Sequence, residues 1–275
     1  MPSRLFTDDE EYEIGEEYLS GTSARALARK YGTGHRVICE GLARQGIEQR
    51  SPSERNRLYQ VNHNAFDKID CEEKAYWYGF LFADGCVSRN KTLSIELSPR
   101  DRNHLYKLKE FLMCESPIKN SESSMGYPTI RFNTTSRRLA ARLMELGITK
   151  GRRNSDIWTY ECPERLWNHW MRGYFDGDGT SGKRPSLGFM GRYDLLQIIR
   201  RVLYVEADRN PHLKIMKHTT SRIYYLIYSG RYNARAVAEY LYRDATIWLE
   251  RKRERIDVWP DRKERMRNSV TGRYE

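Results

Sequence analysis

Two aspartates with glycine neighbours could bind a divalent cation together. Asp84 and Asp178 each close a copy of one pattern, WYGFLFADGC at Trp77–Cys86 and MRGYFDGDGT at Met171–Thr180. Carboxylate oxygens are hard ligands that suit magnesium, calcium or manganese. For a single copy, a solvated capping residue would be the simpler interpretation. Two copies predict instead a pseudo-symmetric molecule whose halves each bring one carboxylate to a shared centre.

The segments that precede these acids are expected to be buried helices. Lys74–Asp84 and Trp167–Asp178 are rich in aromatic and apolar residues and contain no proline. Each carries two small residues four positions apart, which lie on one helix face and let two backbones approach closely; these are Gly79 with Ala83 and Gly173 with Gly177. We therefore expect the two helices to pack together, with both acids at the same end. Left-handed glycines at the next positions, Gly85 and Gly179, are expected to end the helices.

Helix stability does not explain the placement of the two acids. An aspartate in the last turn faces the negative end of the helix dipole, at a cost of a few tenths of a kcal/mol. Two close carboxylates also repel each other. A bound divalent cation would remove both costs, so metal binding is the simplest interpretation.

The two segments resemble the paired signature motifs of LAGLIDADG homing endonucleases. The resemblance implies that the last acid of each motif, Asp84 or Asp178, binds catalytic metal, helped by the carbonyl of the preceding residue, Ala83 or Gly177. It implies Mg²⁺ as the cofactor, with Mn²⁺ as a substitute and Ca²⁺ supporting binding without cleavage. The second copy follows the family pattern closely, whereas the first has Phe82 where an earlier acid usually stands.

The same family usually carries a lysine near each scissile phosphate, after the last helix of each half. In the second half this corresponds to Lys252 in the run LERKRERI, and in the first half GITKGRRN leaves Lys150, Arg152 and Arg153 as alternatives. A cation there could stabilise charge in the transition state or orient the attacking water. A solvated charge run at a helix end is an equally simple interpretation of each residue alone.

The elements around the motifs repeat in the same order. After the first motif we expect strands near Thr92–Ser98, Ser116–Ser121 and Tyr127–Thr135 and helices at Asp101–Met113 and Ser136–Leu146. After the second we expect strands near Ser186–Arg192, His212–His218 and Ile223–Ser229, a helix at Tyr193–Val205 and one long helix from Asn233 to about Ile256. The sequence thus predicts an α+β fold, a pseudo-twofold duplicated αββαββα unit like that of the LAGLIDADG endonucleases.

The domain boundaries follow from these elements. We assign residues 1–50 to a small all-α helix-turn-helix domain, 51–68 to a linker and 69–150 to the first half. Residues 151–165 form the linker between the halves, 166–258 the second half and 259–275 a basic tail.

The N-terminal domain is predicted from three short helical runs with tight turns. Ala24, Leu27, Ala28 and Tyr31 are expected to pack against Val37, Ile38 and Leu42, with Gly32 at the turn. The third run would then present outward the candidate DNA-binding residues His35, Arg36 and Arg44. A three-helix interaction module that does not bind DNA is the alternative.

Charge and strand alternation together indicate double-stranded DNA as the partner. The chain has a net charge of +11 and a pI of about 9.4, which suits a polyanion. If Leu93, Ile95 and Leu97 face the helices, the opposite face presents hydrogen-bonding side chains that could read base edges in a major groove; these candidates are Ser94, Glu96, Ser98, Arg131 and Asn133. In the second half the facing is ambiguous, and the candidates are Arg192, Lys214 and Lys217.

Cysteine usage and the absence of long apolar segments limit where the protein can act. Five scattered cysteines without a CxxC pair predict neither a disulfide framework nor a zinc site. No apolar run is long enough to span a membrane and no signal-like N-terminus is present, so we expect an intracellular, cytoplasmic monomer. The predicted function is a site-specific homing endonuclease that hydrolyses both strands of DNA and, by resemblance, leaves 3′ overhangs. A DNA-binding regulator of the same fold and an RNA maturase that assists intron splicing are the alternatives.

Overall fold

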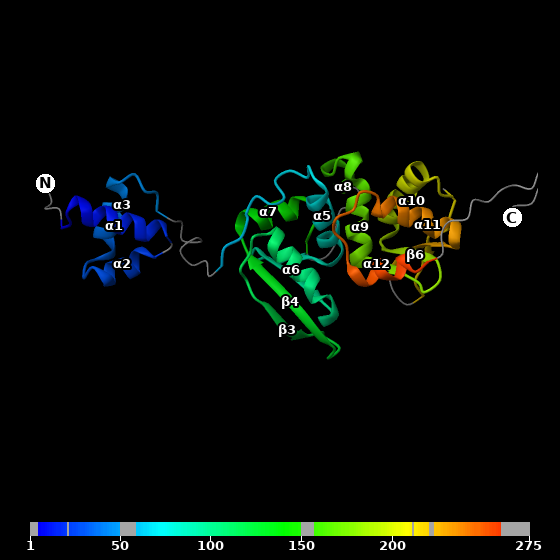
Figure 1. Cartoon of the computed structure of the whole chain (residues 1–275), viewed down its shortest axis with the longest axis horizontal. Coiled ribbons are helices and arrows are strands. Elements are labelled where there is room, and N and C mark those ends of the chain that lie inside the picture. The colour runs from blue at the N-terminus through cyan, green and yellow to red at the C-terminus, as the bar shows by residue number, and fades with distance from the viewer. Residues whose placement is uncertain are drawn as a thin grey trace, which may run out of the picture. The chain divides into compact units, whose positions relative to one another are not determined.

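The chain forms two compact units, residues 1–58 and residues 59–275 (Figure 1). The computed structural model describes residues 5–20, 22–49, 59–149, 157–210, 212–219 and 223–259. Val61, Ala65 and Phe66, in the stretch predicted as a linker, are buried in the core of the second unit. All five cysteines are free thiols. None of the helices in the described ranges is long and apolar enough to cross a membrane.

The first unit contains the three predicted helices, α1 (Asp8–Leu19), α2 (Ala24–Lys30) and α3 (His35–Arg44). Thr7 and Ser23 cap the first two helices through their hydroxyl oxygens. The turn between α2 and α3 passes through Gly32 at φ +63°, a conformation that glycine adopts without strain. The core joins residues of all three helices: Ile14, Tyr18, Ala24, Leu27, Ala28, Ile38 and Leu42.

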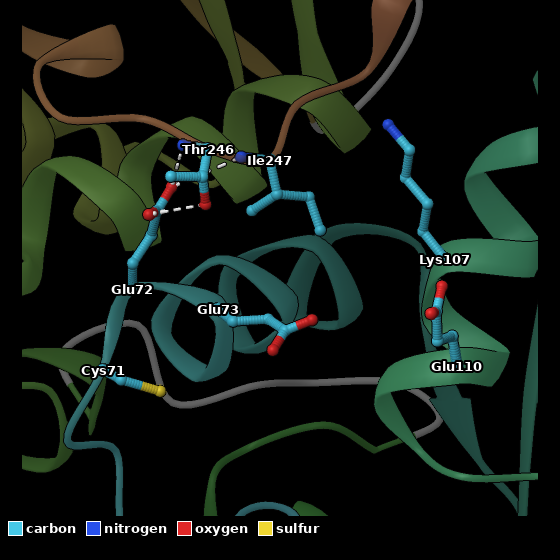
Figure 2. Close-up of a pocket in the computed structure, with 7 residues that line it drawn as sticks. All are labelled: Cys71, Glu72, Glu73, Lys107, Glu110, Thr246 and Ile247. Atoms are coloured by element: carbon cyan, nitrogen blue, oxygen red, sulfur yellow. Dashed lines mark hydrogen bonds between the residues drawn. The ribbon is translucent and has the colours of Figure 1, made fainter.

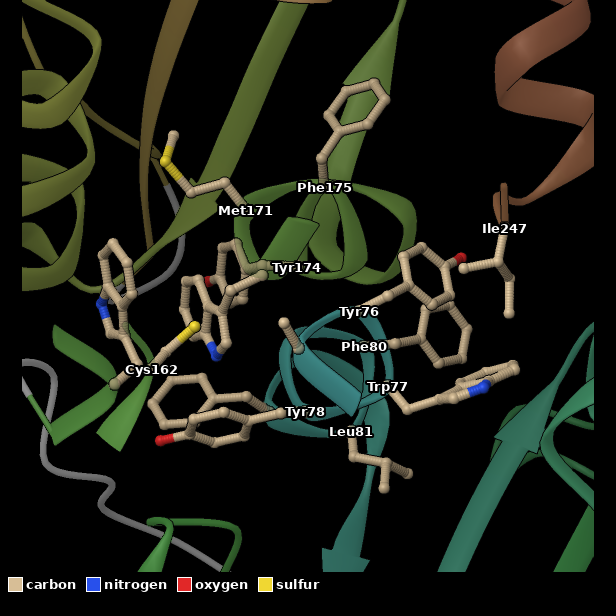
Figure 3. Packing of buried hydrophobic residues seen from close by; sticks show 14 of the residues in the cluster. Tyr76, Trp77, Tyr78, Phe80, Leu81, Cys162, Met171, Tyr174, Phe175 and Ile247 are labelled. Atoms are coloured by element: carbon tan, nitrogen blue, oxygen red, sulfur yellow. The ribbon is translucent and has the colours of Figure 1, made fainter. Parts of the chain in front are cut away.

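The second unit is organised around two motif helices, α5 (Glu72–Asp84) and α9 (Trp167–Asp178), which pack along each other. The contact is made by backbone. A Cβ on Gly79 would lie 1.9 Å from the carbonyl oxygen of Trp170, and a Cβ on Gly173 would lie 2.0 Å from that of Tyr76. The predicted close approach of the two glycine faces is therefore confirmed. The aromatic side chains Tyr76, Trp77 and Tyr78 project from successive positions of α5 into the surrounding core (Figure 3).

Gly85 and Gly179 do follow the two helices, but the predicted left-handed conformation is wrong. Their φ values are −77° and −95°, and both are extended. Close packing explains these glycines instead, since a Cβ would lie 2.6 Å from the Leu81 carbonyl oxygen in one case and 2.3 Å from that of Phe175 in the other. The extended backbone lets each motif helix continue directly into a strand.

Each motif helix is followed by a four-stranded antiparallel sheet. The first sheet has the order β1-β2-β4-β3 and the second β5-β6-β8-β7. The first half contains β1 (Cys86–Val87), β2 (Thr92–Leu97), α6 (Arg102–Phe111), β3 (Ile118–Glu122), β4 (Pro128–Thr135) and α7 (Arg137–Glu145). The second contains β5 (Gly179–Ser181), β6 (Ser186–Gly191), α10 (Tyr193–Ala207), β7 (Met216–Lys217), β8 (Tyr224–Ser229) and α11 (Arg231–Tyr242). Both halves follow the αββαββα order, and the predicted α+β class is confirmed.

The single long helix predicted from Asn233 to about Ile256 is wrong. The chain forms α11 and a separate α12 (Glu250–Asp257), with a break in which Arg243 is extended and Asp244 has φ +54°. The break is stabilised by hydrogen bonds from the motif helices, because the Ile247 carbonyl accepts from Arg172 and the Leu249 amide donates to Asp176. Another short helix, α8 (Ile157–Glu161), lies in the stretch predicted as the linker between the halves.

Candidate active site

The C-terminal ends of α5 and α9 bring the two motif acids to the same place. A Cβ on Gly177 would lie 2.4 Å from the Cβ of Ala83 and 3.2 Å from Oδ2 of Asp84. The Asp84 carboxylate therefore lies against the last turn of α9, whose final residue is Asp178. A Cβ at position 177 would clash with Ala83 and would also press on that carboxylate. The missing side chain of Gly177 thus allows the two acids to share one end of the helix pair.

The donor set at this end fits a divalent cation. It consists of the carboxylates of Asp84 and Asp178 and the nearby backbone carbonyls of Ala83 and Gly177, all of them hard oxygen ligands. No group of three or more histidine, cysteine or acidic side chains able to hold a metal occurs in the described part of the chain. Magnesium commonly binds through one or two carboxylates and completes its shell with water and substrate phosphates. Two acids with carbonyls are therefore sufficient for a site that also takes a phosphate.

Lys252 of α12 lies at the C-terminal end of α9. Its Nζ donates to the carbonyl oxygens of Phe175 and Gly179, the latter at 2.7 Å, and lies 3.4 Å from that of Gly177. Only 3% of the residue is exposed, and burial lowers the pKa of the ammonium group to about 8 against the opposing charges of Asp176, Asp84 and Asp178. The lysine predicted from the LERKRERI run therefore places a cation at the negative end of the motif helix, beside its last carbonyls and the two acids.

A buried polar chain connects the two halves beside the acids. The Tyr76 hydroxyl donates to Oδ2 of Asp176 at 2.7 Å, and the Leu249 amide donates to the same oxygen at 2.8 Å. Because Tyr76 uses its proton in this bond, His104 Nε2 donates to the Tyr76 oxygen at 2.9 Å. Burial raises the pKa of Asp176 to about 6 and lowers that of His104 to about 3. Leu249 caps α12, so this chain holds the helix that carries Lys252.

A second buried cluster holds the break between α11 and α12 to the motif helices. Arg172 is fully buried and donates to the carbonyls of Leu241 and Ile247 and to Glu72 Oε1. Glu72 in turn accepts from the Thr246 amide at 2.6 Å and the Thr246 hydroxyl at 2.9 Å. Glu72, Thr246 and Ile247 line a pocket of about 510 Å³ at the start of α5, together with Cys71, Glu73, Lys107 and Glu110 (Figure 2). The pocket lies at the opposite end of α5 from Asp84.

Sequence reasoning missed both clusters. Asp176 and Arg172 stand inside the motif, where their burial is unfavourable unless each finds a partner. Their partners lie far away in the chain, at Glu72, Tyr76 and the break near Leu249. The only available signal was the presence of a charged side chain in an otherwise apolar helix.

The outer face of the first sheet is polar, as the alternation predicted. Leu93 and Ile95 are buried, whereas Ser94 and Glu96 on β2 are half-exposed. Across the ladder Ser94 lies opposite Asn133 and Glu96 opposite Arg131. Glu96 accepts from Thr129 Oγ1 at 2.8 Å and pairs with Arg131, which lowers the pKa of its carboxyl. Ser98, the last of these candidates, comes just after β2 and precedes a 3₁₀ turn at Pro99–Asp101.

The second-half candidates lie at the end of the central strand β6 and in or just before the edge strand β7. Arg192 follows β6 as the N-cap of α10 and pairs with Asp194. Lys214 and Lys217 are exposed, and Lys217 belongs to the edge strand β7. The facing that was ambiguous in the sequence is resolved by burial, because Leu226 and Tyr228 point into the core and Tyr225 and Ile227 point away from it.

The remaining candidates are in the first unit or outside the described residues. Lys150 and Arg153 lie outside the described residues. In the first unit Arg36 is exposed and pairs with Glu40, and His35 lies within 3.7 Å of the Cys39 sulfur. Arg44 bonds to Glu11, which is only 3% exposed. That ion pair joins α3 to α1 and raises the pKa of Arg44.

Comparison with known proteins gives similarity at the level of structure. No protein-family model matches the sequence, and no curated protein matches it. Among solved structures, the homing endonuclease I-WcaI bound to its DNA recognition sequence has a TM-score of 0.48 at 13% identity, over 70% of this chain and 90% of that chain. The LAGLIDADG homing endonuclease I-SmaMI bound to cleaved DNA has a TM-score of 0.43 at 13% identity, over 66% and 86%.

I-DmoI in complex with DNA and Ca has a TM-score of 0.41 at 15% identity, over 65% of this chain and 88% of that chain. At these identities and TM-scores, the similarities say nothing about activity. The chain is similar in structure to LAGLIDADG homing endonucleases over about two thirds of its length.

Proposed function

We propose that this protein is a divalent-metal-dependent endonuclease that cuts both strands of a specific DNA site. The observation that carries the proposal is the meeting of Asp84 with the last turn of α9, where the absent side chain of Gly177 leaves 3.2 Å between the Cβ position and Asp84 Oδ2. A DNA-binding regulator has no need to hold two acids together against their mutual repulsion. A nuclease gains from it, because paired carboxylates are ligands for cations that bind phosphate.

Asp84 and Asp178 would hold the cation, with help from the carbonyls of Ala83 and Gly177. When bound there, a divalent cation supplies an activated water and neutralises charge on the leaving oxygen. Lys252 holds the end of α9 through the carbonyls of Phe175 and Gly179. Its ammonium group also adds positive charge beside the phosphate. Because Lys252 is buried against these carbonyls, it fixes the geometry of the acids before DNA arrives.

The two sheets would supply DNA binding. In each half the motif helix runs directly into the first strand of a sheet, so the sheet begins next to the acid that ends the helix. A two-stranded or wider ribbon fits the major groove, where side chains reach base edges. The halves differ in sequence, so the target would be long and not a perfect palindrome. Cleavage leaving 3′ overhangs remains part of this proposal.

The test begins with a site selected from randomised duplex DNA by binding in Ca²⁺ and then incubated with Mg²⁺. We expect the wild-type protein to cut both strands, and the Asp178→Asn variant to lose cleavage by at least about a thousandfold, since a metal ligand is lost. Its binding in Ca²⁺ should remain largely intact. Asp84→Asn should behave in the same way.

Asp208→Asn provides the matched control. It makes the same chemical change at an exposed residue with φ +49°, a conformation that asparagine also adopts readily. Undiminished cutting by Asp178→Asn would overturn the assignment of this acid. Wild-type protein that binds the selected site but never cuts it in Mg²⁺ or Mn²⁺ would favour the regulator.

A further inference from the structure

Apolar side chains dominate the outer face of the second sheet, where Ser186 and Ser229 also lie, whereas the outer face of the first sheet is polar. On β6 and β8 the side chains of Leu187, Phe189, Leu226 and Tyr228 are buried in the core. The alternate positions must therefore point to the other face of the sheet. In register across the strands, Met190 lies opposite Tyr225, which lies opposite Met216 on β7, and Gly188 lies opposite Ile227.

Two observations fix this facing. A Cβ on Gly188 would lie 3.0 Å from Cγ1 of Ile227 and 3.2 Å from Cγ2 of Thr180, so Ile227 and Thr180 flank Gly188 on the outer side. The backbone bond from His218 to Ile223 continues the ladder, which places Ile223 on the same face as Tyr225. Met190, Met216 and Ile223 are 39%, 43% and 44% exposed. We call the set Met190, Met216, Ile223, Tyr225 and Ile227 the apolar face.

The corresponding face of the first sheet has no such residues. Its outward positions on β2 and β4 are Thr92, Ser94, Glu96, Thr129, Arg131, Asn133 and Thr135. Every one of these side chains donates or accepts hydrogen bonds. The two sheets occupy equivalent places after the two motif helices, so their outer faces would contact the same kind of partner. The side chains that make these contacts differ, being hydrogen-bonding in the first sheet and mainly apolar in the second.

Charge around the apolar face identifies its occupant. Exposed Lys183 and Arg184 form the turn that leads into β6, and exposed Lys214 lies two residues before Met216 of the edge strand β7. A second copy of this basic chain would bring a rim of like charge against this one. The major groove of DNA matches both parts, because phosphates line its edges and thymine methyl groups are the apolar feature of its floor.

We propose that the apolar face recognises thymine 5-methyl groups, whereas the first sheet recognises hydrogen-bonding base edges. The inference rests on the proposed function, since it takes the sheets as the DNA-binding surfaces. It adds that the two half-sites are read by different chemistry. Met190 and Met216 are the principal specificity-determining residues, because flexible thioether side chains adapt to methyl groups.

Replacement of thymine by deoxyuridine tests this directly, because it removes the methyl group and keeps base pairing. The probe is the duplex selected from a randomised library by binding in Ca²⁺, with deoxyuridine placed in one half-site at a time. We expect binding to weaken roughly fourfold for each contacted methyl in one half-site, the value of one buried methyl-sized group. Substitution in the other half-site should leave the affinity unchanged.

Variants assign the sensitive half-site to its sheet. The Met190→Ser, Met216→Ser double variant should bind the thymine and deoxyuridine duplexes equally, and each single variant should lose part of the difference. Both positions are exposed enough to tolerate the change. Arg131→Gln, the matched control on the first sheet, should keep the full sensitivity to deoxyuridine.

The proposal is overturned if deoxyuridine weakens neither half-site or both equally, or if the serine variants keep the sensitivity. It is also overturned if the protein self-associates and Met190→Ser abolishes that association, since a second copy would then be the occupant. Because binding is measured in Ca²⁺, a protein that binds in this manner but never cuts would leave the inference intact while the proposed function failed. Absence of any duplex binding would overturn both.

Discussion

The two motif helices meet through the same backbone contact but differ in the side chains beside it. In the first copy Phe82 packs edge-on against Trp170 of α9, with ring centroids 5.4 Å apart. In the second copy the equivalent residue is Asp176, and it accepts a hydrogen bond from Tyr76, the α5 residue that corresponds to Trp170. An apolar pair on one side thus replaces a polar pair on the other. The position two residues before each motif acid therefore tolerates either chemistry, provided that its partner on the other helix matches.

The glycines, by contrast, are equivalent in both copies. The Cβ positions of Gly79 and Gly173 lie 1.9 Å and 2.0 Å from carbonyl oxygens of the facing helix. The neighbours are backbone atoms, which cannot move without separating the helices. The comparison therefore predicts symmetry where the backbones touch and asymmetry where the side chains do.

Substitution of either glycine by alanine should have the largest effect. We expect Gly79→Ala and Gly173→Ala each to lower the free energy of unfolding by about 4 kcal/mol, above the usual range for an overpacked site because backbone atoms clash. The gain in helix propensity, at most about 1 kcal/mol, does not offset this. Urea unfolding followed by tryptophan fluorescence measures it, since all six tryptophans lie between residues 77 and 259.

The matched control is Gly188→Ala on the second sheet. Its Cβ would meet Cγ1 of Ile227 at 3.0 Å and the Leu226 carbonyl oxygen at 3.2 Å. The Ile227 side chain can move aside, and the carbonyl contact is much less close than those at Gly79 and Gly173, so we expect a loss of about 1 kcal/mol. Clearly unequal effects of Gly79→Ala and Gly173→Ala would refute the symmetry of the backbone contact.

The difference between Asp176 and Phe82 predicts a smaller loss of stability, which should be larger for the Asp176 variant than for the Phe82 variant. Asp176→Leu should lower the free energy of unfolding by about 3 kcal/mol, because the buried Tyr76 hydroxyl and Leu249 amide lose their acceptor at roughly 1–3 kcal/mol each. Phe82→Leu keeps an apolar contact with Trp170 and should cost about 1 kcal/mol.

A second change separates lost acceptors from general damage to the core. Tyr76→Phe should lower the free energy of unfolding less in the Asp176→Leu background than in wild type. The bond from Tyr76 to Asp176 is already absent in that background, whereas the loss of the acceptor for His104 Nε2 is the same in both. If the two losses simply add, the hydrogen bond between the halves does not contribute as the structure indicates.

The helix pair and its acids could be predicted from sequence because their signals are local. A repeated pattern placed Asp84 and Asp178, and glycines four residues apart indicated a close approach that the structure confirms. Alternation over six residues predicted the outward side chains of β2. The predicted αββαββα order requires a first strand in each half, but the residues of β1 and β5 could not be located, since strands of two or three residues show no alternation.

Features that depend on distant partners could not be predicted. The break between α11 and α12 falls in a stretch without proline or glycine, and hydrogen bonds from Arg172 and Asp176 stabilise it. Gly85 and Gly179 were predicted to be left-handed, but both are extended. The sequence shows that a glycine ends each helix. It does not show whether the glycine is needed for a positive φ or because a neighbouring atom leaves no space for a Cβ. The apolar face of the second sheet required burial to decide which side of β8 faces the core.

The polar chain from His104 through Tyr76 to Asp176 should also make the stability of the protein depend on pH. Burial lowers the pKa of His104 to about 3 in the folded chain, whereas an exposed histidine has a pKa of about 6.5. As the pH falls below 6.5, the unfolded chain binds a proton at this residue and the folded chain does not, so stability is lost progressively down to about pH 3. Asp176 acts in the opposite direction, since a raised carboxyl pKa favours the folded state as the pH falls from about 6 towards 4.

The difference between wild-type protein and His104→Gln isolates the histidine. At pH 5 the lowered pKa corresponds to about 2 kcal/mol of lost stability, at 1.36 kcal/mol per pH unit below 6.5. We expect His104→Gln, whose amide can still donate to Tyr76, to lose about 2 kcal/mol less than wild type between pH 7 and pH 5 in urea unfolding. Phe82→Leu, in the apolar pair with Trp170, should keep the wild-type dependence of stability on pH. Parallel curves for wild type and His104→Gln would mean that the histidine is protonated in the folded chain, and that the polar chain from His104 to Asp176 is arranged differently.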